Sequence, residues 1–186
     1  CDVVLSKDHE VIVFHDYSLK RLCNLEDNVA EMNSNELRQI NLLDTKSKIP
    51  TLEEMFYRVD SRVPILIEIK SGFNPIIEER LVELTRTYQG EVAFQSFDQK
   101  ACEWFRDNAP YYNTGLIISS NEIKKNIIQE LNIDFIAVDI NNIESVDVQN
   151  LRKNNLPIFT WTINNDEKLK LSQKFADNCI FEDLLI

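Results

Sequence analysis

The chain has 186 residues with 20 basic and 31 acidic side chains, a formal net charge of −11 and 44% hydrophobic residues. These values fit one folded domain and exclude disordered, collagen-like and coiled-coil chains. The acidic balance argues against nucleic-acid binding, because a surface that neutralises phosphates needs clustered lysine and arginine. No apolar run reaches the roughly 18 residues that a membrane span requires. Any anionic substrate must therefore meet a local cation or a metal ion.

The first part of the chain predicts two short strands followed by a polar segment. Residues 2–6 and 11–15 have strand-like sequences, and the turn-like residues 7–10 join them. Residues 17–48 are polar and weakly patterned, with one short helical candidate at 35–40. We interpret this polar segment as an insertion within a single domain that spans residues 1–186.

From Thr51 onward the sequence alternates helical patterns with short apolar runs. Thr51 and Glu54 form a capping box, which predicts a helix that runs to about Asp60. Short polar residues that cap the first turn predict four later helices, which begin after Asn74, Asp98, Asn121 and Asn165. The expected strands between the helices are 64–70, 91–96, 115–119, 134–140, 157–163 and 178–181. This alternation is typical of βαβ units and a parallel sheet.

Such a sheet is either an open doubly wound sheet or a closed barrel, and residues 64–70 favour the barrel. Ile65, Ile67 and Ile69 share one face of this strand, whereas Glu68 and Lys70 share the other. Two charged side chains are costly under a layer of helices but suit the mouth of a barrel lumen. The prediction is a TIM (β/α)8 barrel, with its chemistry at the carboxyl ends of the strands.

The four cysteines are far apart in sequence and lack metal-ligand spacing. Cys1, Cys23, Cys102 and Cys179 form no C-x-x-C pair and have no nearby histidine that would complete a zinc site. We interpret them as structural thiols, which indicates a reducing compartment and a cytoplasmic location. A leader or membrane segment before Cys1 remains an open alternative.

Few residues are candidates for catalysis. His15 ends an apolar strand, where it is either packed at the strand end beside Asp16 or acts as a general acid or base. His9 lies in the polar turn and is interpreted as a solvated residue. Glu68 and Lys70 form either a structural ion pair or a site in which Glu68 binds a divalent cation and Lys70 attracts an anion.

Ordered motifs along the whole chain resemble the glycerophosphodiester phosphodiesterase family. The family's early Glu-x-Asp-Val, Thr-Lys-Asp-Gly and Val-x-His-Asp pattern is similar to residues 2–8 and 13–16. The matching segments are Asp2-Val-Val-Leu-Ser-Lys-Asp8, Val13-Phe-His-Asp16, Ile49-Pro-Thr-Leu-Glu-Glu54, Ile67-Glu-Ile-Lys70, Gln95-Ser-Phe-Asp98 and Trp161-Thr-Ile-Asn164.

The resemblance implies a TIM barrel with an insertion after its second strand and assigns roles to individual residues. Asp2 and Glu68 would be metal ligands, and His15 would be one of two acid/base histidines. Lys70 would contact the phosphate, and Trp161 would line the substrate pocket. Ligands that are all oxygen atoms favour Mg²⁺ or Ca²⁺ over zinc.

The sequence departs from the family pattern at both ends and in one turn. The family's His-Arg-Gly and a Glu two residues before Asp2 would precede Cys1, so the first βα unit is expected to lie outside this chain. A complete barrel typically has about 250 residues, which agrees with that expectation. His9 replaces the usual turn glycine, and Asn178-Cys-Ile-Phe-Glu182 replaces Gly-Ile-Ile-Thr-Asp, which leaves a role for Glu182 open.

The expected activity is metal-dependent hydrolysis of glycerophosphodiesters to glycerol 3-phosphate and an alcohol. Because one catalytic histidine and one metal ligand are expected upstream, the 186 residues alone are expected to be incomplete for activity. Alternatives are an inactive barrel that binds phosphodiesters or a partner, a phospholipase-type enzyme acting on intact lipid, and an unrelated sugar-metabolising barrel. If the protein hydrolyses glycerophosphodiesters, its substrate is a small molecule. The sequence does not predict an oligomeric state.

Overall fold

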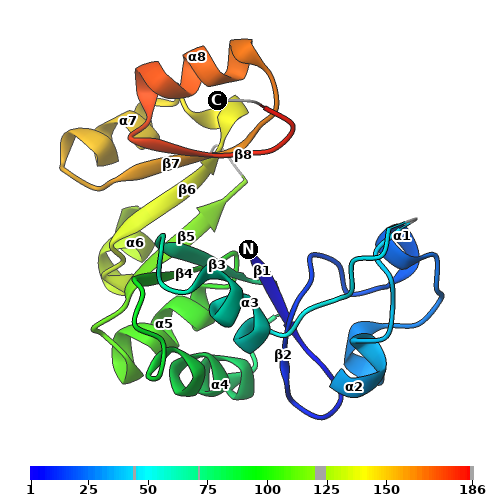
Figure 1. Cartoon of the computed structure of the whole chain (residues 1–186). Helices are drawn as coiled ribbons and strands as arrows, with labels where there is room; N and C mark the ends of the chain where they lie inside the picture. The colour runs from blue at the N-terminus through cyan, green and yellow to red at the C-terminus, as the bar shows by residue number, and fades with distance from the viewer. Residues whose placement is uncertain (44, 71, 120–124, 185–186) are drawn as a thin grey trace.

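A computed structural model describes residues 1–43, 45–70, 72–119 and 125–184. Its centre is one curled sheet of eight strands (Figure 1). The strands are β1 (Asp2–Leu5), β2 (Val11–Val13), β3 (Ile65–Ile69), β4 (Val92–Ser96), β5 (Asn113–Ile118), β6 (Phe135–Asp139), β7 (Ile158–Ile163) and β8 (Asn178–Phe181). Their order is β2-β1-β3-β4-β5-β6-β7-β8, and every neighbouring pair is parallel except β1 and β2.

The sheet bends as a barrel wall does, and among the described strands β8 pairs only with β7. Helices cover its outer face (Figure 1). They are α3 (Leu52–Val59), α4 (Pro75–Thr85), α5 (Gln99–Asn108), α6 (Lys125–Leu131), α7 (Val146–Lys153) and α8 (Asp166–Phe175). The seven parallel strands and their intervening helices confirm the predicted TIM-barrel class as a partly open barrel.

The predicted parity of β3 is confirmed by where its side chains pack. Ile65, Ile67 and Ile69 are buried in the hydrophobic core between the sheet and its helices. Leu66 and Glu68 instead line the hollow on the inner side of the sheet. The alternation therefore places one face of the strand in the core and leaves the other for the lumen.

The helix starts follow the predicted capping chemistry. Thr51 Oγ1 accepts a hydrogen bond from the Glu54 amide, and the Glu54 carboxylate accepts one from the Thr51 amide. The side chains of Asn74, Asp98 and Asn165 each accept a hydrogen bond from the first turn of α4, α5 and α8. The predicted cap at residue 121 lies outside the described residues.

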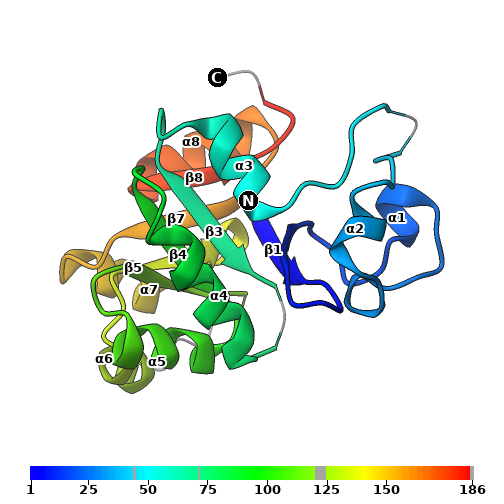
Figure 2. The same cartoon turned by 60° about the horizontal axis from the view of Figure 1, so that its bottom comes forward.

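The insertion differs from its prediction in detail. It contains α1 (Lys20–Cys23), a 3-10 turn (Val29–Glu31) and α2 (Ser34–Leu37), and it lies to one side of the sheet (Figure 1 and Figure 2). The expected helix at 35–40 is wrong in its bounds, because Asn33 and Glu36 form a capping box that starts the helix earlier. The insertion has a small core that it shares with the first two strands: Val4, Ile12, Phe14, Leu19, Val29, Leu37 and Ile49.

The turn between β1 and β2 anchors this insertion. The Asp8 carboxylate accepts hydrogen bonds from Ser6 Oγ at 2.6 Å, from the Ser34 amide at 2.7 Å and from Ser34 Oγ at 2.8 Å. These bonds lower the pKa of Asp8 to about 2, and the bond from Ser6 has the largest effect. His9 has a φ of 62°, the left-handed region that favours glycine, as expected for a residue in the place of a turn glycine.

Across the described ranges, no helix has the length and apolar character needed to cross a membrane.

Candidate functional site

Asp2 and Glu68 lie side by side on the inner face of the sheet. Their Cα atoms are register partners in the parallel pair β1 and β3, so their side chains point the same way. The amide of Glu68 donates to the Cys1 carbonyl, and the amide of Lys70 donates to the Val3 carbonyl. This ladder brings together the two carboxylates that the sequence nominated as metal ligands.

Lys70 connects the two carboxylates. Its Nζ lies 2.6 Å from Glu68 Oε1 and 3.3 Å from Asp2 Oδ1. Burial raises the pKa of Glu68, although contact with Lys70 opposes the rise. Burial works against the charge of Lys70, but Glu68 and Asp2 outweigh it and raise the pKa of Lys70. The inner face thus carries two acidic groups and one cation within contact distance.

Glu68 continues into a row of register partners across the sheet. Its partner is Gln95, the partner of Gln95 is Gly115, and the partner of Gly115 is Phe135. Gln95 is 4% exposed, and its Nε2 lies 3.5 Å from Glu68 Oε2. The Phe135 ring covers Gly115 and stacks on Phe159 with 4.9 Å between ring centroids. Along this row the side chains change from the acid of Glu68 to the amide of Gln95 and then to the aromatic ring of Phe135. The site therefore has a polar side and an apolar side.

His15 follows β2 at the edge of this site. The Phe14 amide donates to the Asp2 carbonyl at 3.0 Å, which ties the chain just before His15 to the first carboxylate. His15 is exposed, and its Nδ1 lies 2.5 Å from Asp16 Oδ1. A positive charge on His15 opposes the rise in the pKa of Glu68 that burial causes. His15 therefore belongs to the same electrostatic neighbourhood as the carboxylates, while His9 lies in the anchoring turn.

Trp161 lies on β7, where its Nε1 donates to the Ala137 carbonyl at 3.0 Å. Its ring meets the edge of Phe97, which follows β4, with 5.7 Å between centroids. Phe97 and Lys70 line a common hollow of about 520 Å³ together with Tyr17, whose hydroxyl donates to the Lys70 carbonyl. The curled sheet thus brings the predicted pocket residue Trp161 to an aromatic neighbour that borders Lys70.

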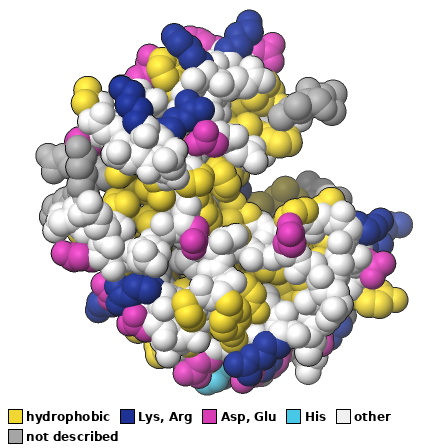
Figure 3. All heavy atoms as spheres, turned by 90° about the vertical axis from the view of Figure 1, so that its left-hand side faces the viewer, with side chains coloured by type: hydrophobic (Ala, Val, Ile, Leu, Met, Phe, Trp, Pro, Cys, Tyr) yellow, Lys and Arg dark blue, Asp and Glu magenta, His cyan; other side chains and the backbone are white. Residues whose placement is uncertain are grey.

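The inner side of the sheet is hollow. A cavity of about 940 Å³ is lined by Asp2, Glu68 and Gln95 and by the apolar side chains of Leu66 and Phe159. Figure 3 shows that the surface of the molecule has a deep notch with hydrophobic side chains along it. The two carboxylates therefore face an open space on the inner side of the sheet.

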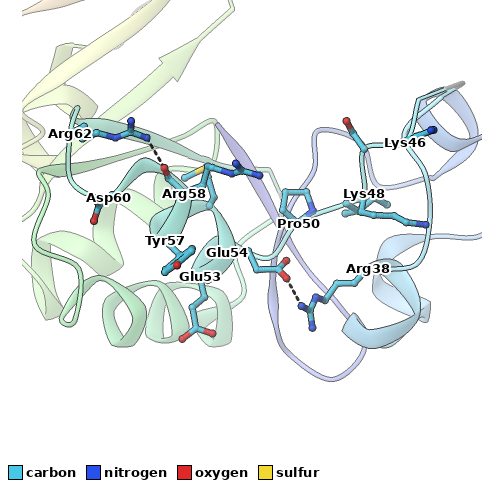
Figure 4. A pocket seen from close by; sticks show the side chains of 13 residues that line it. Arg38, Lys46, Lys48, Pro50, Glu53, Glu54, Tyr57, Arg58, Asp60 and Arg62 are labelled. Atoms are coloured by element: carbon cyan, nitrogen blue, oxygen red, sulfur yellow. Dashed lines mark hydrogen bonds and ion pairs between the residues drawn. The ribbon is translucent and has the colours of Figure 1, made fainter.

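A larger groove of about 1560 Å³ lies elsewhere, between α3 and the segment before it (Figure 4). Arg38 pairs there with Glu54, and Tyr57 is fully open to solvent at 88% exposure. The predicted site residues do not line this groove. Its size alone does not make it the functional site.

The donor chemistry fits a hard divalent cation with few protein ligands. Glu68 Oε1 is buried, and its contact in the described structure is the ion pair with Lys70 Nζ at 2.6 Å rather than a hydrogen bond of regular geometry. Within the described ranges, no three His, Cys, Asp or Glu side chains are grouped closely enough to hold a metal. Two carboxylates suffice for Mg²⁺, which usually keeps several waters and binds substrate phosphate oxygens.

Four residues around the site received no role from the sequence: Tyr17, Arg21, Gln95 and Phe97, although Gln95 and Phe97 lie in a segment that matches the family. Gln95 could have been found by extending the parity argument from β3 to β4. Phe97 follows Gln95 by two residues and so shares its face. Tyr17 and Arg21 lie in the weakly patterned insertion, whose path no periodicity predicts.

Comparison with known proteins agrees with this geometry. The glycerophosphoryl diester phosphodiesterase family matches residues 1–185. A glycerophosphodiester phosphodiesterase of Caldanaerobacter subterraneus is 27% identical over 194 residues, which cover 98% of this chain and 80% of that protein.

Two solved structures share the fold. That of a Thermotoga maritima glycerophosphodiester phosphodiesterase is 27% identical with a TM-score of 0.80, covering 97% of this chain and 79% of that one. The structure of an Oleispira antarctica phosphodiesterase in complex with the product sn-glycerol-3-phosphate is 19% identical, with a TM-score of 0.88. The match covers 97% of this chain and 78% of that one. With the family match along nearly its whole length, the chain belongs to the glycerophosphoryl diester phosphodiesterase family.

Proposed function

We propose that the intact protein hydrolyses glycerophosphodiesters to glycerol 3-phosphate and an alcohol, with a divalent cation bound at Asp2 and Glu68. The observation that carries this proposal is the register pairing of these two carboxylates beside Lys70, on the wall of a hollow. Family membership and the product complex of the Oleispira antarctica neighbour support the same reaction.

The cation, Mg²⁺ or Ca²⁺, would supply positive charge for the non-bridging phosphate oxygens, which become more negative during the reaction. Asp2 and Glu68 hold it through hard oxygen ligands. Lys70 provides a fixed second positive charge and contacts the phosphate. This combination explains how a chain with a net charge of −11 binds an anionic substrate.

His15 is the proton-transfer group that this chain contributes. As a general acid or base it either takes the proton of the attacking oxygen or protonates the leaving alcohol. Trp161 and Phe97 form the apolar wall against which the carbon part of the substrate packs.

The proposal includes the remaining sequence-based expectations. Residues 1–186 form one barrel domain that carries the insertion at about residues 17–48, and the substrate is a small molecule. The protein is cytoplasmic.

The test is glycerol 3-phosphate release from glycerophosphocholine by the full-length protein, with Mg²⁺ or Ca²⁺ and then with a chelator. Chelation should abolish turnover. His15→Gln should lower kcat by about 10² to 10⁴. His9→Gln is the matched control because it removes the other histidine of the chain, which lies in the anchoring turn. Near-wild-type turnover of His15→Gln with metal present would overturn the assignment.

The same assay separates the rival functions. An inactive phosphodiester-binding barrel would bind glycerophosphocholine in calorimetry with no product release. A phospholipase-type enzyme would act on phosphatidylcholine vesicles in preference to the soluble diester. We expect preference for the soluble diester, because the two proposed metal ligands line a hollow of about 940 Å³, which suits a small molecule.

A further inference from the structure

The carboxylate of Asp16 has partners on two sides. One is His15, whose Nδ1 lies 2.5 Å from Asp16 Oδ1. The other is Arg21, which donates from Nε to Asp16 Oδ2 at 2.7 Å and from Nη2 to Asp16 Oδ1 at 2.8 Å. The three side chains form a continuous chain that ends at the candidate acid/base group.

The contact with Arg21 fixes both the charge and the direction of Asp16. A planar guanidinium that binds both oxygens of a carboxylate holds it more firmly than a single hydrogen bond does. Hydrogen bonding from Arg21 is the largest cause that lowers the pKa of Asp16 to about 2, and that from His15 adds to it. Asp16 is therefore ionised at neutral pH and can only accept hydrogen bonds.

An acceptor at 2.5 Å determines where the proton of a neutral His15 lies. Nδ1 must carry the hydrogen that is donated to Asp16, which leaves Nε2 as the unprotonated nitrogen. A general base needs such a free nitrogen, directed at the reacting group, and a general acid delivers a proton from the same atom. The orientation of the ring follows from the same bond.

Arg21 is supplied by the insertion. It lies on α1, and Leu19 just before this helix is buried in the insertion's own core. The Leu19 amide donates to the Asp27 carbonyl, and its carbonyl accepts from the Cys23 amide. Glu182, directly after β8, adds its negative charge to the causes that raise the pKa of Arg21. Arg21 is thus held from its own helix and attracted by carboxylates on two sides.

We propose that Arg21 is a positioning residue: by clamping Asp16, it holds His15 in the tautomer with hydrogen on Nδ1 and presents Nε2 for proton transfer. The tautomer and ring orientation do not depend on the proposed function. Only the effect on turnover rests on it.

The chain contains only two histidines, so nitrogen NMR can read the tautomer directly. Two-bond proton–nitrogen spectra of the imidazoles at about pH 8, where an ordinary histidine is neutral, show which ring nitrogen carries hydrogen. The imidazole signals that disappear in His15→Gln are those of His15. We expect the wild-type His15 pattern to be that of hydrogen on Nδ1 and the Arg21→Gln pattern to be a mixture of both tautomers.

Matched variants make the result specific. Arg106→Gln is the control, since Arg106 forms a comparable two-bond contact with Asp107 on the exposed side of α5. It should leave the His15 signals unchanged. Asp16→Asn should shift the proton to Nε2, because an amide can donate to Nδ1, and this variant keeps the test available if Arg21→Gln unfolds. Hydrogen on Nε2 in the wild type, or identical spectra for wild type and Asp16→Asn, would overturn the proposal.

Activity of the full-length protein provides the second readout. Arg21→Gln should reduce kcat by up to about 10² with KM nearly unchanged, as expected when a reacting group is misplaced. Arg21→Lys should recover part of this loss, since it restores the charge but not the two-bond geometry. A changed tautomer in a protein with no diesterase activity would leave the positioning role standing and refute the proposed function. An unchanged kcat in an active protein would refute the positioning role.

Discussion

The Cα atoms of Asp2 and Glu68 are register partners in adjacent parallel strands, so two carboxylates face the same hollow. Lys70 lies within 3.3 Å of one and 2.6 Å of the other. In the absence of a bound cation, this single ammonium compensates both negative charges. If the cation of the proposed function binds here, stability and cation binding are coupled at this point of the sheet.

Lys70→Met should destabilise the chain by roughly 1–3 kcal/mol. Losing one partner of a fully buried ion pair costs about 3–5 kcal/mol. The loss expected here is smaller because the Asp2 side chain is 31% exposed, so water screens its charge. Added Mg²⁺ or Ca²⁺ should restore part of the loss, because the cation replaces the missing charge. The measurement is urea unfolding with chelator and with each metal. Exposed Lys153→Gln is the control, and equal metal dependence in both variants would contradict the coupling.

Glu78 on α4 predicts a stability that falls as the pH rises. It is completely buried, both carboxylate oxygens lack a hydrogen-bond partner in the described structure, and burial raises its pKa to about 7 from 4.5. A raised folded-state pKa means that the folded chain binds the proton more tightly. The stabilisation is full below about pH 4.5 and is lost between there and pH 7, by roughly 3 kcal/mol at most.

Glu78→Gln should remove this dependence and raise the urea midpoint at pH 8 relative to wild type. The comparison is the difference in unfolding free energy between the two proteins at pH 5 and pH 8. Glu79→Gln, at the exposed neighbouring position, is the control. A wild-type-minus-variant difference that stays constant over this range would show that Glu78 does not titrate there.

His9→Gly should stabilise the chain by about 0.5–1 kcal/mol. A residue with a side chain at a φ of 62° pays a steric cost that glycine does not, and this exceeds the extra freedom that glycine gains on unfolding. His9→Ala separates the causes, since alanine keeps the strain while removing the ring. Thermal unfolding at constant pH measures both, and an equal gain for alanine would assign the effect to the imidazole instead.

Gly115→Ala should be strongly destabilising although the change is one methyl group. A Cβ at this position would lie 2.1 Å from Cε2 of Phe135, whose ring is stacked on Phe159. Overpacking of this kind costs about 1–3 kcal/mol. Gly72→Ala is the matched control, because a Cβ there meets no atom within 4 Å. Phe135→Leu combined with Gly115→Ala should cost less than the sum of the single changes. Strict additivity would rule out the clash.

Local chemistry explains why so much of the fold could be predicted. A cap such as Asn74 acts on its own first turn, and the alternation in β3 reports which face is buried, so neighbouring residues carry the information. Of the site's carboxylates, Glu68 followed from the same alternation, whereas Asp2 was assigned by the family resemblance alone. Their register, with Asp2 opposite Glu68, depends on two strands that lie far apart in the sequence, β1 (Asp2–Leu5) and β3 (Ile65–Ile69), and needed the structure.

The insertion shows where prediction stopped. Helices α1 and α2 have four residues each, too short for a periodic pattern, and they are stabilised by tertiary burial of Leu19 and Leu37. The link from Arg21 to Asp16 depends on that packing. A charged residue in a polar segment looks solvated in the sequence, and only the folded path shows which carboxylate it reaches.

The shared core of the insertion has a consequence for how the protein can be shortened or redesigned. Ile12 and Phe14 pack in the same cluster as Leu19 and Val29, so the segment buries the strand that leads directly into His15. Excision of residues 18–48 would uncover that strand and release the histidine with it. The segment therefore supports the strand that precedes the candidate acid/base residue, and a shortened version of this barrel has to retain it.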